Sequence, residues 1–260
     1  MSHGNLLLLL HAHLPFIRHP EYEDFLEEDW LFEAITEVYL PLLDMMQRLS
    51  GEGVEYRLTM SVTPPLCEML ADPLLQQRYR RYLARHLELA EKETVRHQGH
   101  ERLSLSSRMY LDHYRTCTRL LDACQGNLLA LFRQQLESGR LEIITCPATH
   151  GFLPLMATDE AVRAQVLVAR DNYRKHFGRL PQGIWLSECA YRPGLEVFLQ
   201  QAGIRYFFVD THGLMYGTPR PRYAVFAPVF TPNGVAAFAR DVESSKQVWS
   251  SKEGYPGDTD

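Results

Sequence analysis

The chain has 260 residues, of which 45% are hydrophobic, and its 32 acidic residues outnumber its 27 Lys and Arg to give a net charge of −5. That hydrophobic share can fill a large core and excludes an intrinsically disordered chain. The acidic balance argues against sequence-independent binding of nucleic acid, which needs clustered Lys and Arg. The apolar run from Leu6 to Leu10 is too short for a membrane span, and no basic residue precedes it as in a signal peptide.

The five cysteines are odd in number and lack the C-x-x-C spacing of metal sites. This pattern argues against a disulfide framework and against a structural zinc site. Together with the missing signal peptide, it predicts a protein of the reducing cytoplasm.

Strands and helices are predicted to alternate along the chain. Strands are predicted at 5–11, 57–62, 141–145, 183–186 and 206–209, with two further segments at 224–226 and 235–239. Helices are predicted at 30–49, 159–177 and 194–202, and helical periodicity fills most of 73–138, with an interruption near Gly99. We interpret 73–138 as a helical insertion within one domain that occupies residues 1–260. Alternating strands and helices predict an α/β fold with a mainly parallel, barrel-like sheet.

Ionisable side chains follow four of the predicted strands, at the ends where function collects in parallel α/β folds. They are His11 and His13 after the first strand, His150 after the third, Glu188 after the fourth, and Asp210 and His212 after the fifth. We therefore expect them to share one rim of the sheet.

Glu188 is the leading candidate for a catalytic residue. It follows the apolar strand residues Ile184 to Leu186, so its carboxylate is expected to be partly desolvated yet open to a ligand. The alternative is a surface Glu that stabilises the N-terminus of the following helix. Cys189 beside it lacks a local His partner and is interpreted as a packed thiol.

The remaining rim residues admit two interpretations each. His11 and His13 alternate along a strand, so they reach one metal ion, together with Asp210 and His150, only if the strand bends there. His150 either contacts a substrate hydroxyl or stabilises its own loop. Asp210 either partners Glu188 as an acid or caps the loop that follows it. Arg240 either binds a sugar by paired hydrogen bonds or forms a structural ion pair.

Three stretches carry a resemblance to a known family. They are His11-Ala-His-Leu-Pro15, Cys146-Pro-Ala-Thr-His-Gly-Phe-Leu-Pro154 and Trp185-Leu-Ser-Glu-Cys-Ala-Tyr-Arg-Pro193. In this order they resemble the first three motifs of glycoside hydrolase family 57, in the form found in its 1,4-α-glucan branching enzymes. The stretches 239–243 and 252–258 also resemble branching enzymes, so the resemblance spans essentially the whole chain.

The resemblance implies a distorted parallel (β/α)7-type barrel with helical additions and a retaining reaction on α-glucans. It implies that Glu188 is the nucleophile, with no cofactor and no metal. The substrate-binding residues that it implies lie along the barrel rim and in the later loops: His11, His13, His150, Trp185, Asp210, Tyr216, Arg240 and Gly257.

The family's acid/base Asp belongs to a fourth motif, and no such motif occurs before Asp260. We therefore expect that the chain is truncated at its C-terminal end, carries the nucleophile half of the site and is inactive alone. Other reactions of the family, α-amylase and 4-α-glucanotransferase, stay open, as does a non-catalytic glucan-binding protein. A metal-dependent polysaccharide deacetylase-like barrel would instead use His11, His13 and Asp210. The oligomeric state has no signal in the sequence.

Overall fold

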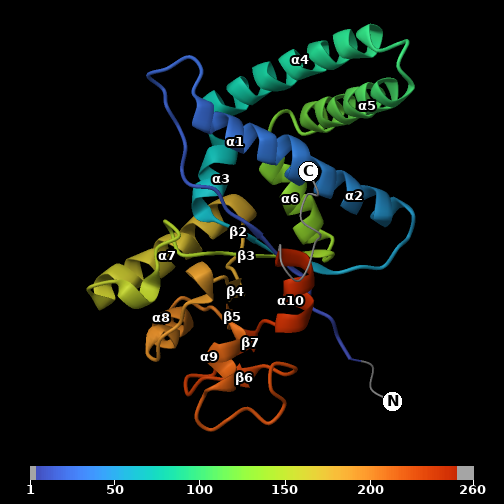
Figure 1. Cartoon of the computed structure of the whole chain (residues 1–260). Helices are drawn as coiled ribbons and strands as arrows, with labels where there is room; N and C mark the ends of the chain where they lie inside the picture. The colour runs from blue at the N-terminus through green and yellow to red at the C-terminus, as the bar shows by residue number, and fades with distance from the viewer. Residues whose placement is uncertain (1–3, 251–260) are drawn as a thin grey trace. The chain divides into compact units, whose positions relative to one another are not determined.

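A computed structural model describes residues 4–250 of the chain. These residues fall into two compact units that interleave along the sequence (Figure 1). Unit 1 consists of the segments up to Leu9, His13–Thr59 and Pro65–Glu142. Unit 2 consists of Leu10–Ala12, Met60–Pro64 and the chain from Ile143 onward.

Helices make up most of unit 1. They are α1 (Leu26–Ala34), the π-helical turn η1 (Ile35–Tyr39), α2 (Leu40–Gly51), α3 (Pro64–Ala71), α4 (Pro73–Arg96), α5 (Glu101–Ala123) and α6 (Leu128–Glu137). The long helices α4 and α5 run side by side as a hairpin (Figure 1). The helix predicted at 30–49 is real but begins earlier, because three acidic residues in the first turn of α1 suit a helix N-terminus.

A buried ion pair joins α1 to α4 within unit 1. The Arg78 Nη1 atom lies 2.6 and 2.7 Å from the two carboxylate oxygens of Glu28, and the Glu28 side chain is 1% exposed. The same guanidinium donates to the backbone carbonyls of His19 and Tyr22, in the loop before α1. Glu28 also accepts from the His19 backbone amide at 2.9 Å. This network fixes the loop by satisfying charges that are costly to bury unpaired.

Seven strands are present among residues 4–250 and form two sheets with the orders β1-β2-β3 and β4-β5-β7-β6. Their bounds are β1 (Leu9–Ala12), β2 (Leu58–Val62), β3 (Leu141–Ile144), β4 (Gly183–Ile184), β5 (Tyr206–Val209), β6 (Val229–Phe230) and β7 (Ala236–Ala239). Strands β4, β5 and β7 are mutually parallel, and β6 pairs antiparallel with β7. Thr145, the residue after β3, forms a parallel bridge with Ile184 of β4. The predicted α/β class is confirmed.

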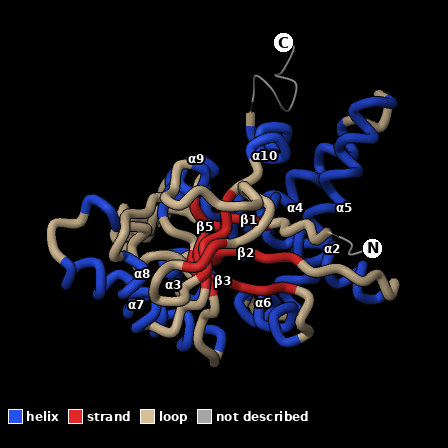
Figure 2. The backbone as a smooth tube through the Cα atoms, turned by 90° about the horizontal axis from the view of Figure 1, so that it is seen from below, coloured by secondary structure: helices blue, strands red, loops and turns tan. Residues whose placement is uncertain are grey.

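The helices of unit 2 are α7 (Asp159–Phe177), α8 (Leu195–Gln201), α9 (Thr211–Met215) and α10 (Val242–Trp249), with short 3-10 turns η2 (Leu153–Leu155) and η3 (Ser187–Cys189). The core of this unit lies between α7, α8, α9 and the strands, and includes the fully buried side chains of Leu186, Leu195 and Phe207. Figure 2 shows β5 among the helices of the unit, with α8 and α9 on different sides of it.

Helix α7 has the bounds that the sequence predicts, because both of its ends carry strong signals. The Thr158 side chain accepts a hydrogen bond from the Ala161 backbone amide at 3.2 Å, as an N-cap does. Gly178 ends the helix in the left-handed conformation, with φ of 72°. Acidic residues in the first turn and basic residues in the last complement the helix dipole.

Three predicted strands are wrong in extent or kind, and the one predicted at 183–186 ends at Ile184. The strand predicted at 5–11 begins only at Leu9, and Leu6, Leu7 and Leu8 are 88%, 53% and 52% exposed. An apolar run predicts burial on both faces, but β1 is an edge strand of its sheet and these residues precede it. The segment 224–226 forms a turn rather than a strand, because Ala224 takes a φ of 51°, outside the extended region.

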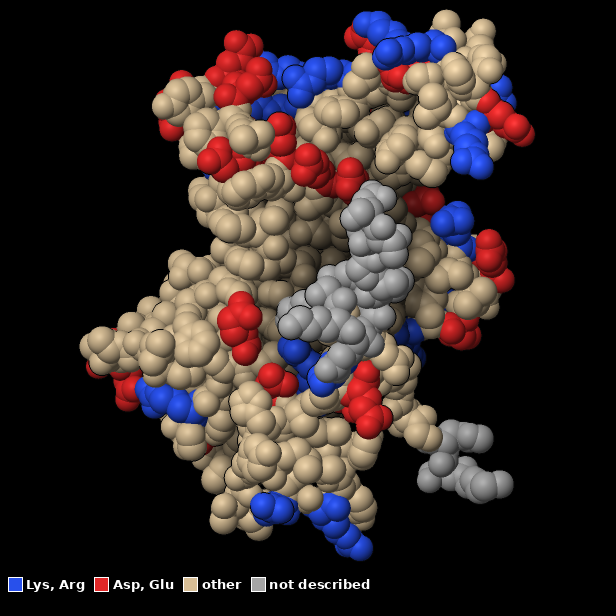
Figure 3. Space-filling model, in the orientation of Figure 1, with Lys and Arg blue, Asp and Glu red and all other residues tan. Residues whose placement is uncertain are grey.

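The charged residues do not gather by sign on the face shown in Figure 3, where Lys and Arg alternate with Asp and Glu. This mixture agrees with the modest net charge of −5. Within residues 4–250, none of the helices has both the length and the apolar character required to cross a lipid bilayer.

Candidate active site

The turn after β4 places the carboxylate of Glu188 at the surface. Trp185 still pairs with the neighbouring strand, since its amide donates to the Thr145 carbonyl at 2.9 Å. The chain then folds into η3, where the Cys189 amide returns to the Leu186 carbonyl at 2.9 Å. Glu188 sits at the apex of this turn and is exposed, whereas Ser187 and Cys189 on either side are 3% and 6% exposed.

The backbone at this turn is strained. Glu188 has φ of 55° and Cys189 has φ of 54°, although both carry side chains that disfavour the left-handed region. Such strain persists only where the surrounding structure imposes it, and it concentrates at functional sites. The strain therefore supports the interpretation of Glu188 as a functional residue over that of an ordinary surface Glu.

His150 is the second residue that a strained backbone presents to the site. It follows β3, has φ of 55°, and its amide donates to the Pro147 carbonyl at 2.8 Å. Burial lowers the pKa of His150, while the negative charge of Glu188 acts in the opposite direction. The imidazole is therefore held neutral and lies within electrostatic range of the Glu188 carboxylate.

His11, at the end of β1, meets both of these loops. Its ring stacks on Trp185 with 4.9 Å between the ring centroids, and its Nε2 atom lies 3.2 Å from the Nε2 atom of His150. On the other side of the ring, Nδ1 lies 2.5 Å from the hydroxyl of Ser61 in β2. The structure thus brings together His11, His150 and Glu188, as the strand-end rule predicts, and places Trp185 beside them.

Asp210 and Arg240 lie beside the buried Cys189. The Arg240 guanidinium is 3.6 Å from the Cys189 sulfur. Burial raises the pKa of the Cys189 thiol, the Arg240 charge lowers it, and the charges of Asp210 and Glu188 raise it further. Cys189 is therefore a protonated, packed thiol, as expected, with three charged residues of the predicted site around it.

Asp210 has a clear structural task. It is the N-cap of α9, and its side chain accepts from the Thr211 amide at 2.8 Å. The Thr211 hydroxyl in turn donates to the Arg240 carbonyl at 2.6 Å, which ties α9 to the end of β7. The cap interpretation of Asp210 is thus confirmed.

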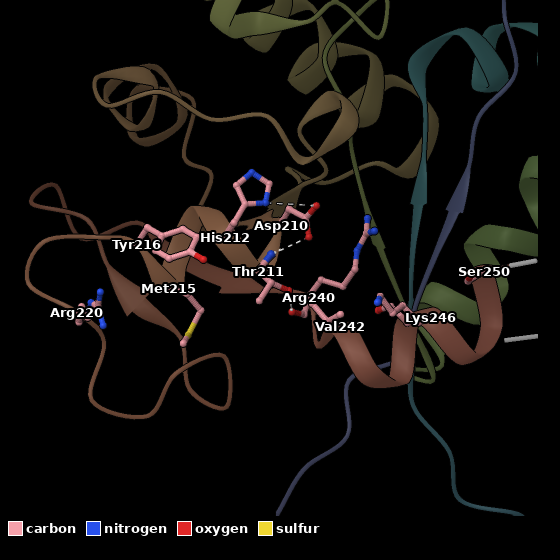
Figure 4. A pocket seen from close by; sticks show the side chains of 11 residues that line it. Asp210, Thr211, His212, Met215, Tyr216, Arg220, Arg240, Val242, Lys246 and Ser250 are labelled. Carbon is pink, nitrogen blue, oxygen red and sulfur yellow. Dashed lines mark hydrogen bonds and ion pairs between the residues drawn. The ribbon is translucent and has the colours of Figure 1, made fainter. Parts of the chain in front are cut away.

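A cavity of about 770 Å³ opens beside these residues. Figure 4 shows that α9 contributes His212 and Met215 to one side, while Arg240 and Lys246 line the other side. Tyr216, which is 78% exposed, and Arg220 come from the loop after α9. A cavity of this size accommodates a small oligomeric ligand. Of its lining residues, the sequence pointed to Asp210, Tyr216, Arg240 and, as a rim residue, His212.

His13 and Gly257 are the two predicted site residues that remain. His13 belongs to unit 1 rather than to unit 2, and is half-buried. Gly257 lies outside the described residues. Within the described range 4–250, His, Cys, Asp and Glu form no group of three or more with the geometry to hold a metal ion.

Sequence reasoning missed Ser61. The strand that carries it, Leu58-Thr-Met-Ser-Val62, is buried over its last four positions, and Ser61 is 0% exposed. A hydroxyl inside a buried strand needs a hydrogen-bond partner, so its presence there was an available signal. It was overlooked because it lies within the strand and not after its end.

Residues 7–256 match the model of the family described as Glycosyl hydrolase family 57. A 1,4-alpha-glucan branching enzyme of Thermococcus kodakarensis is 37% identical over 98% of this chain and 41% of its own length.

Two solved structures are also similar. The alpha-amylase AmyC of Thermotoga maritima has a TM-score of 0.94 and 48% identity, covering 99% of this chain and 49% of that chain. A GH57-type branching enzyme from Pyrococcus horikoshii has a TM-score of 0.88 and 39% identity, covering 98% of this chain and 50% of that chain. The chain therefore spans about half the length of these relatives, or less.

Proposed function

The chain belongs to glycosyl hydrolase family 57, and on that premise we propose that it acts as a 1,4-alpha-glucan branching enzyme. Such an enzyme moves a segment of an α-1,4-glucan onto a 6-hydroxyl of a glucan chain. The observation that carries the proposal is the exposed Glu188 carboxylate, held at a strained turn beside His150. The likeness to relatives named as branching enzymes supports this choice of reaction.

Glu188 is the nucleophile in this proposal. Its carboxylate attacks the anomeric carbon, the bond from that carbon to the 4-oxygen of the next glucose breaks, and a glycosyl-enzyme ester forms. A second carboxylic acid, roughly 5–5.5 Å away in retaining enzymes, gives its proton to the departing oxygen. The 6-hydroxyl of the acceptor then loses its proton to that residue and displaces Glu188. We assign the acid to the family's downstream motif and not to Asp210, whose carboxylate caps α9.

The sugar-binding residues follow from the neighbours of Glu188. Trp185 is half-buried and offers an aromatic surface, while His11 and His150 offer hydrogen bonds to sugar hydroxyls. Tyr216 and Arg240 line the adjoining cavity, where we place the acceptor glucan. His13 and Gly257 stay candidates for the same substrate, and the reaction needs no cofactor or metal.

Hydrolysis is the competing reaction, because the AmyC structure, at 48% identity, is that of an alpha-amylase. Water would then replace the 6-hydroxyl in the second step, with the same nucleophile. The two reactions differ in their products. Transfer creates one α-1,6 linkage and no new reducing end, whereas hydrolysis creates one reducing end and no α-1,6 linkage.

The test is to treat amylose with the full-length protein and to follow both products. We expect α-1,6 linkages, measured by proton NMR and by the chains that a debranching enzyme releases, to exceed the gain in reducing ends. Reducing ends without α-1,6 linkages would show that the activity is that of an amylase and not of a branching enzyme. Shorter and longer α-1,4 chains without either product would point to 4-α-glucanotransferase activity. Binding of maltooligosaccharides without any turnover would leave only a glucan-binding protein.

We further propose that the protein works in the cytoplasm, in the synthesis of glycogen-like α-glucans. All five cysteines are free thiols, and Cys67, Cys117, Cys146 and Cys189 are buried. Buried thiols that form no disulfide are compatible with a reducing compartment. Cell fractionation, with the protein found together with its glucan in the soluble cytoplasmic fraction, tests this proposal.

A further inference from the structure

The loop that carries His150 is hydrogen-bonded to helix α7 through Gln165. The side-chain oxygen of Gln165 accepts from the Thr149 amide at 2.9 Å, and its side-chain nitrogen donates to the Thr149 hydroxyl, also at 2.9 Å. The backbone carbonyl of Gln165 accepts from the Ala148 amide at 3.0 Å. Gln165 thus contributes three hydrogen bonds to the two residues that precede His150.

The paired hydrogen bonds to Thr149 fix its orientation as well as its position. A single bond would let the loop rotate about the line from donor to acceptor, whereas two bonds between one carboxamide and one residue prevent that rotation. A carboxamide suits this task because it carries an acceptor oxygen and a donor nitrogen side by side. His150, the next residue, therefore extends from a fixed point.

The loop also lies close to Gln165 after His150. A Cβ atom added at Gly151 would lie 3.4 Å from the side-chain carbon Cδ of Gln165 and would collide with the methyl group of Met156. Between Thr149 and Gly151, His150 takes its left-handed φ of 55°. This conformation is costly for a residue with a side chain, so neighbouring contacts must impose it. The contacts with Gln165 lie on both sides of His150 and can do so.

We propose that Gln165 is a positioning residue for the sugar-binding site, which acts by holding the imidazole of His150 beside His11. Helix α7 is a firm support for this task, because both of its ends are capped and its Tyr173 hydroxyl donates to the Ile143 carbonyl of β3 at 2.8 Å. The role in sugar binding rests on the proposed glucan-transfer function, whereas the positioning of His150 does not.

The consequence is a sugar-binding group that is already in place before the substrate arrives. A loop that moves freely must be ordered when the sugar binds, and that ordering reduces the affinity. Loss of the contacts with Gln165 should therefore weaken glucan binding more than it slows bond breaking at Glu188, which raises KM more than it lowers kcat. A merely structural hydrogen bond would affect stability without this change in KM.

Gln165→Met tests this role in the full-length protein. Methionine keeps an unbranched side chain and a good fit to a helix, but it has no N–H to donate and only a weakly accepting sulfur. We expect KM for maltooligosaccharides to rise about fivefold, the factor for one hydrogen bond, and kcat to change by less than about twofold. In an NMR titration the pKa of His150, which burial lowers, should move back towards 6.5 as the released loop exposes the ring.

Gln76→Met is the matched control. Gln76 is also a half-buried glutamine in a helix, and its side chain donates to the Leu70 carbonyl at 2.8 Å within unit 1. This variant should lower the melting temperature as Gln165→Met does, but it should change neither KM nor the pKa of His150.

Two further variants test whether Gln165 acts through its loop partners. Thr149→Val removes only the bond to the hydroxyl, so it should raise KM in the same direction by a smaller factor. In a protein that already carries His150→Gln, the additional change Gln165→Met should raise KM no further, because the residue that it positions is absent. A fivefold rise in that background would overturn the proposal.

The proposed function and the role of Gln165 fail separately. If Gln165→Met moves the pKa of His150 as expected but the parent protein forms no α-1,6 linkages, the proposed function is wrong and the positioning of His150 stands. If the parent forms branches and the variant leaves KM and the pKa of His150 unchanged, only the role of Gln165 is wrong.

Discussion

Glu28 and Glu188 are two carboxylates of one chain in opposite circumstances. Glu28 is 1% exposed and lies against the Arg78 guanidinium in unit 1, where it also accepts a backbone amide. Glu188 is exposed at a strained turn in unit 2, flanked by buried neighbours. The charge of the first carboxylate is buried but paired with a guanidinium, and the second carboxylate is exposed on a strained backbone. A buried and paired carboxylate therefore indicates a structural role, and a carboxylate that a strained backbone exposes to solvent indicates a chemical role.

Replacing the Glu188 carboxylate tests the chemical half of this contrast and has the largest expected effect. Glu188→Gln should lower the rate of glucan transfer by about a thousandfold or more, because the nucleophile and its acid act as a unit. Its stability should stay within about 0.5 kcal/mol of the parent, since the side chain is exposed. Initial rates on amylose and a thermal melt measure the two quantities.

Glu160→Gln, at an exposed position in α7, is the matched control for this substitution. It should leave the rate unchanged and lower the stability by no more than the roughly 0.3–1 kcal/mol that a first-turn carboxylate gains from the helix dipole. A Glu188 variant that keeps more than about a tenth of the activity would remove Glu188 from the role of nucleophile.

Breaking the buried pair tests the structural half. Arg78→Met removes the guanidinium and leaves Glu28 charged in the interior, which should destabilise the protein by about 3–5 kcal/mol. Denaturant unfolding measures this change. The exposed pair Lys92–Glu88 provides the comparison, and Glu88→Gln should have no measurable effect. Equal effects of the two substitutions would show that the buried Arg78–Glu28 pair contributes no more to stability than an exposed pair does.

A larger residue at Gly183, in the strand before Glu188, tests how rigidly the structure holds the turn. A Cβ atom added at Gly183 collides with the ring of Tyr206 on the neighbouring strand. Gly183→Ala should therefore cost about 1–3 kcal/mol and also reduce activity, because the displaced strand leads into the turn. Gly99→Ala, where nothing lies within 4 Å of the added atom, is the control. An equal stability for both variants would show that the strand yields easily.

The smallest expected effect is a pH dependence of stability that comes from His150. Burial lowers the pKa of this residue, and the charge of Glu188 raises it. The pKa of His150 is lowered in the folded protein from its ordinary value of 6.5. At a pH below 6.5 the unfolded chain therefore binds more protons than the folded protein does. Stability should then fall as the pH drops from 6.5 towards the lowered pKa. Glu188 is the charged group facing His150 in unit 2, and it limits the shift.

His150→Gln should remove this part of the pH dependence. Denaturant titrations between pH 7 and pH 5 compare the slopes of the two proteins. A steeper slope in the variant would mean that the charge of Glu188 outweighs burial and that the pKa of His150 is raised.

The parts of the fold that the sequence predicted well are those with local signals at both ends. Helix α7 has a Thr158 cap and a Gly178 stop, and β5 is a short apolar run that ends at Asp210. The misses have non-local causes. The exposure of Leu6 to Leu8 depends on where β1 lies in its sheet, which no local pattern reveals. Helix α9 was missed because its five residues are too few to show a helical period.

The candidate site divides in the same way. The rule that side chains after parallel strands meet at one edge predicted the grouping of His11, His150 and Glu188. It did not predict the contact of the His11 ring with Ser61, because the two residues are 50 positions apart in the chain. Nor did it predict the left-handed backbone of Glu188, which the surrounding packing imposes.

The unequal burial of the five thiols offers a practical handle on the molecule. Cys124, at the C-terminal end of α5, is half-buried, whereas the other four are buried. A maleimide dye should therefore attach first at Cys124 and leave Cys146 and Cys189 near Glu188 unmodified. Because burial raises the pKa of the Cys124 thiol, coupling should be faster in mildly alkaline buffer than at neutrality. The labelled protein would carry an optical probe in unit 1 alone, which makes motions of the α4–α5 hairpin observable during turnover.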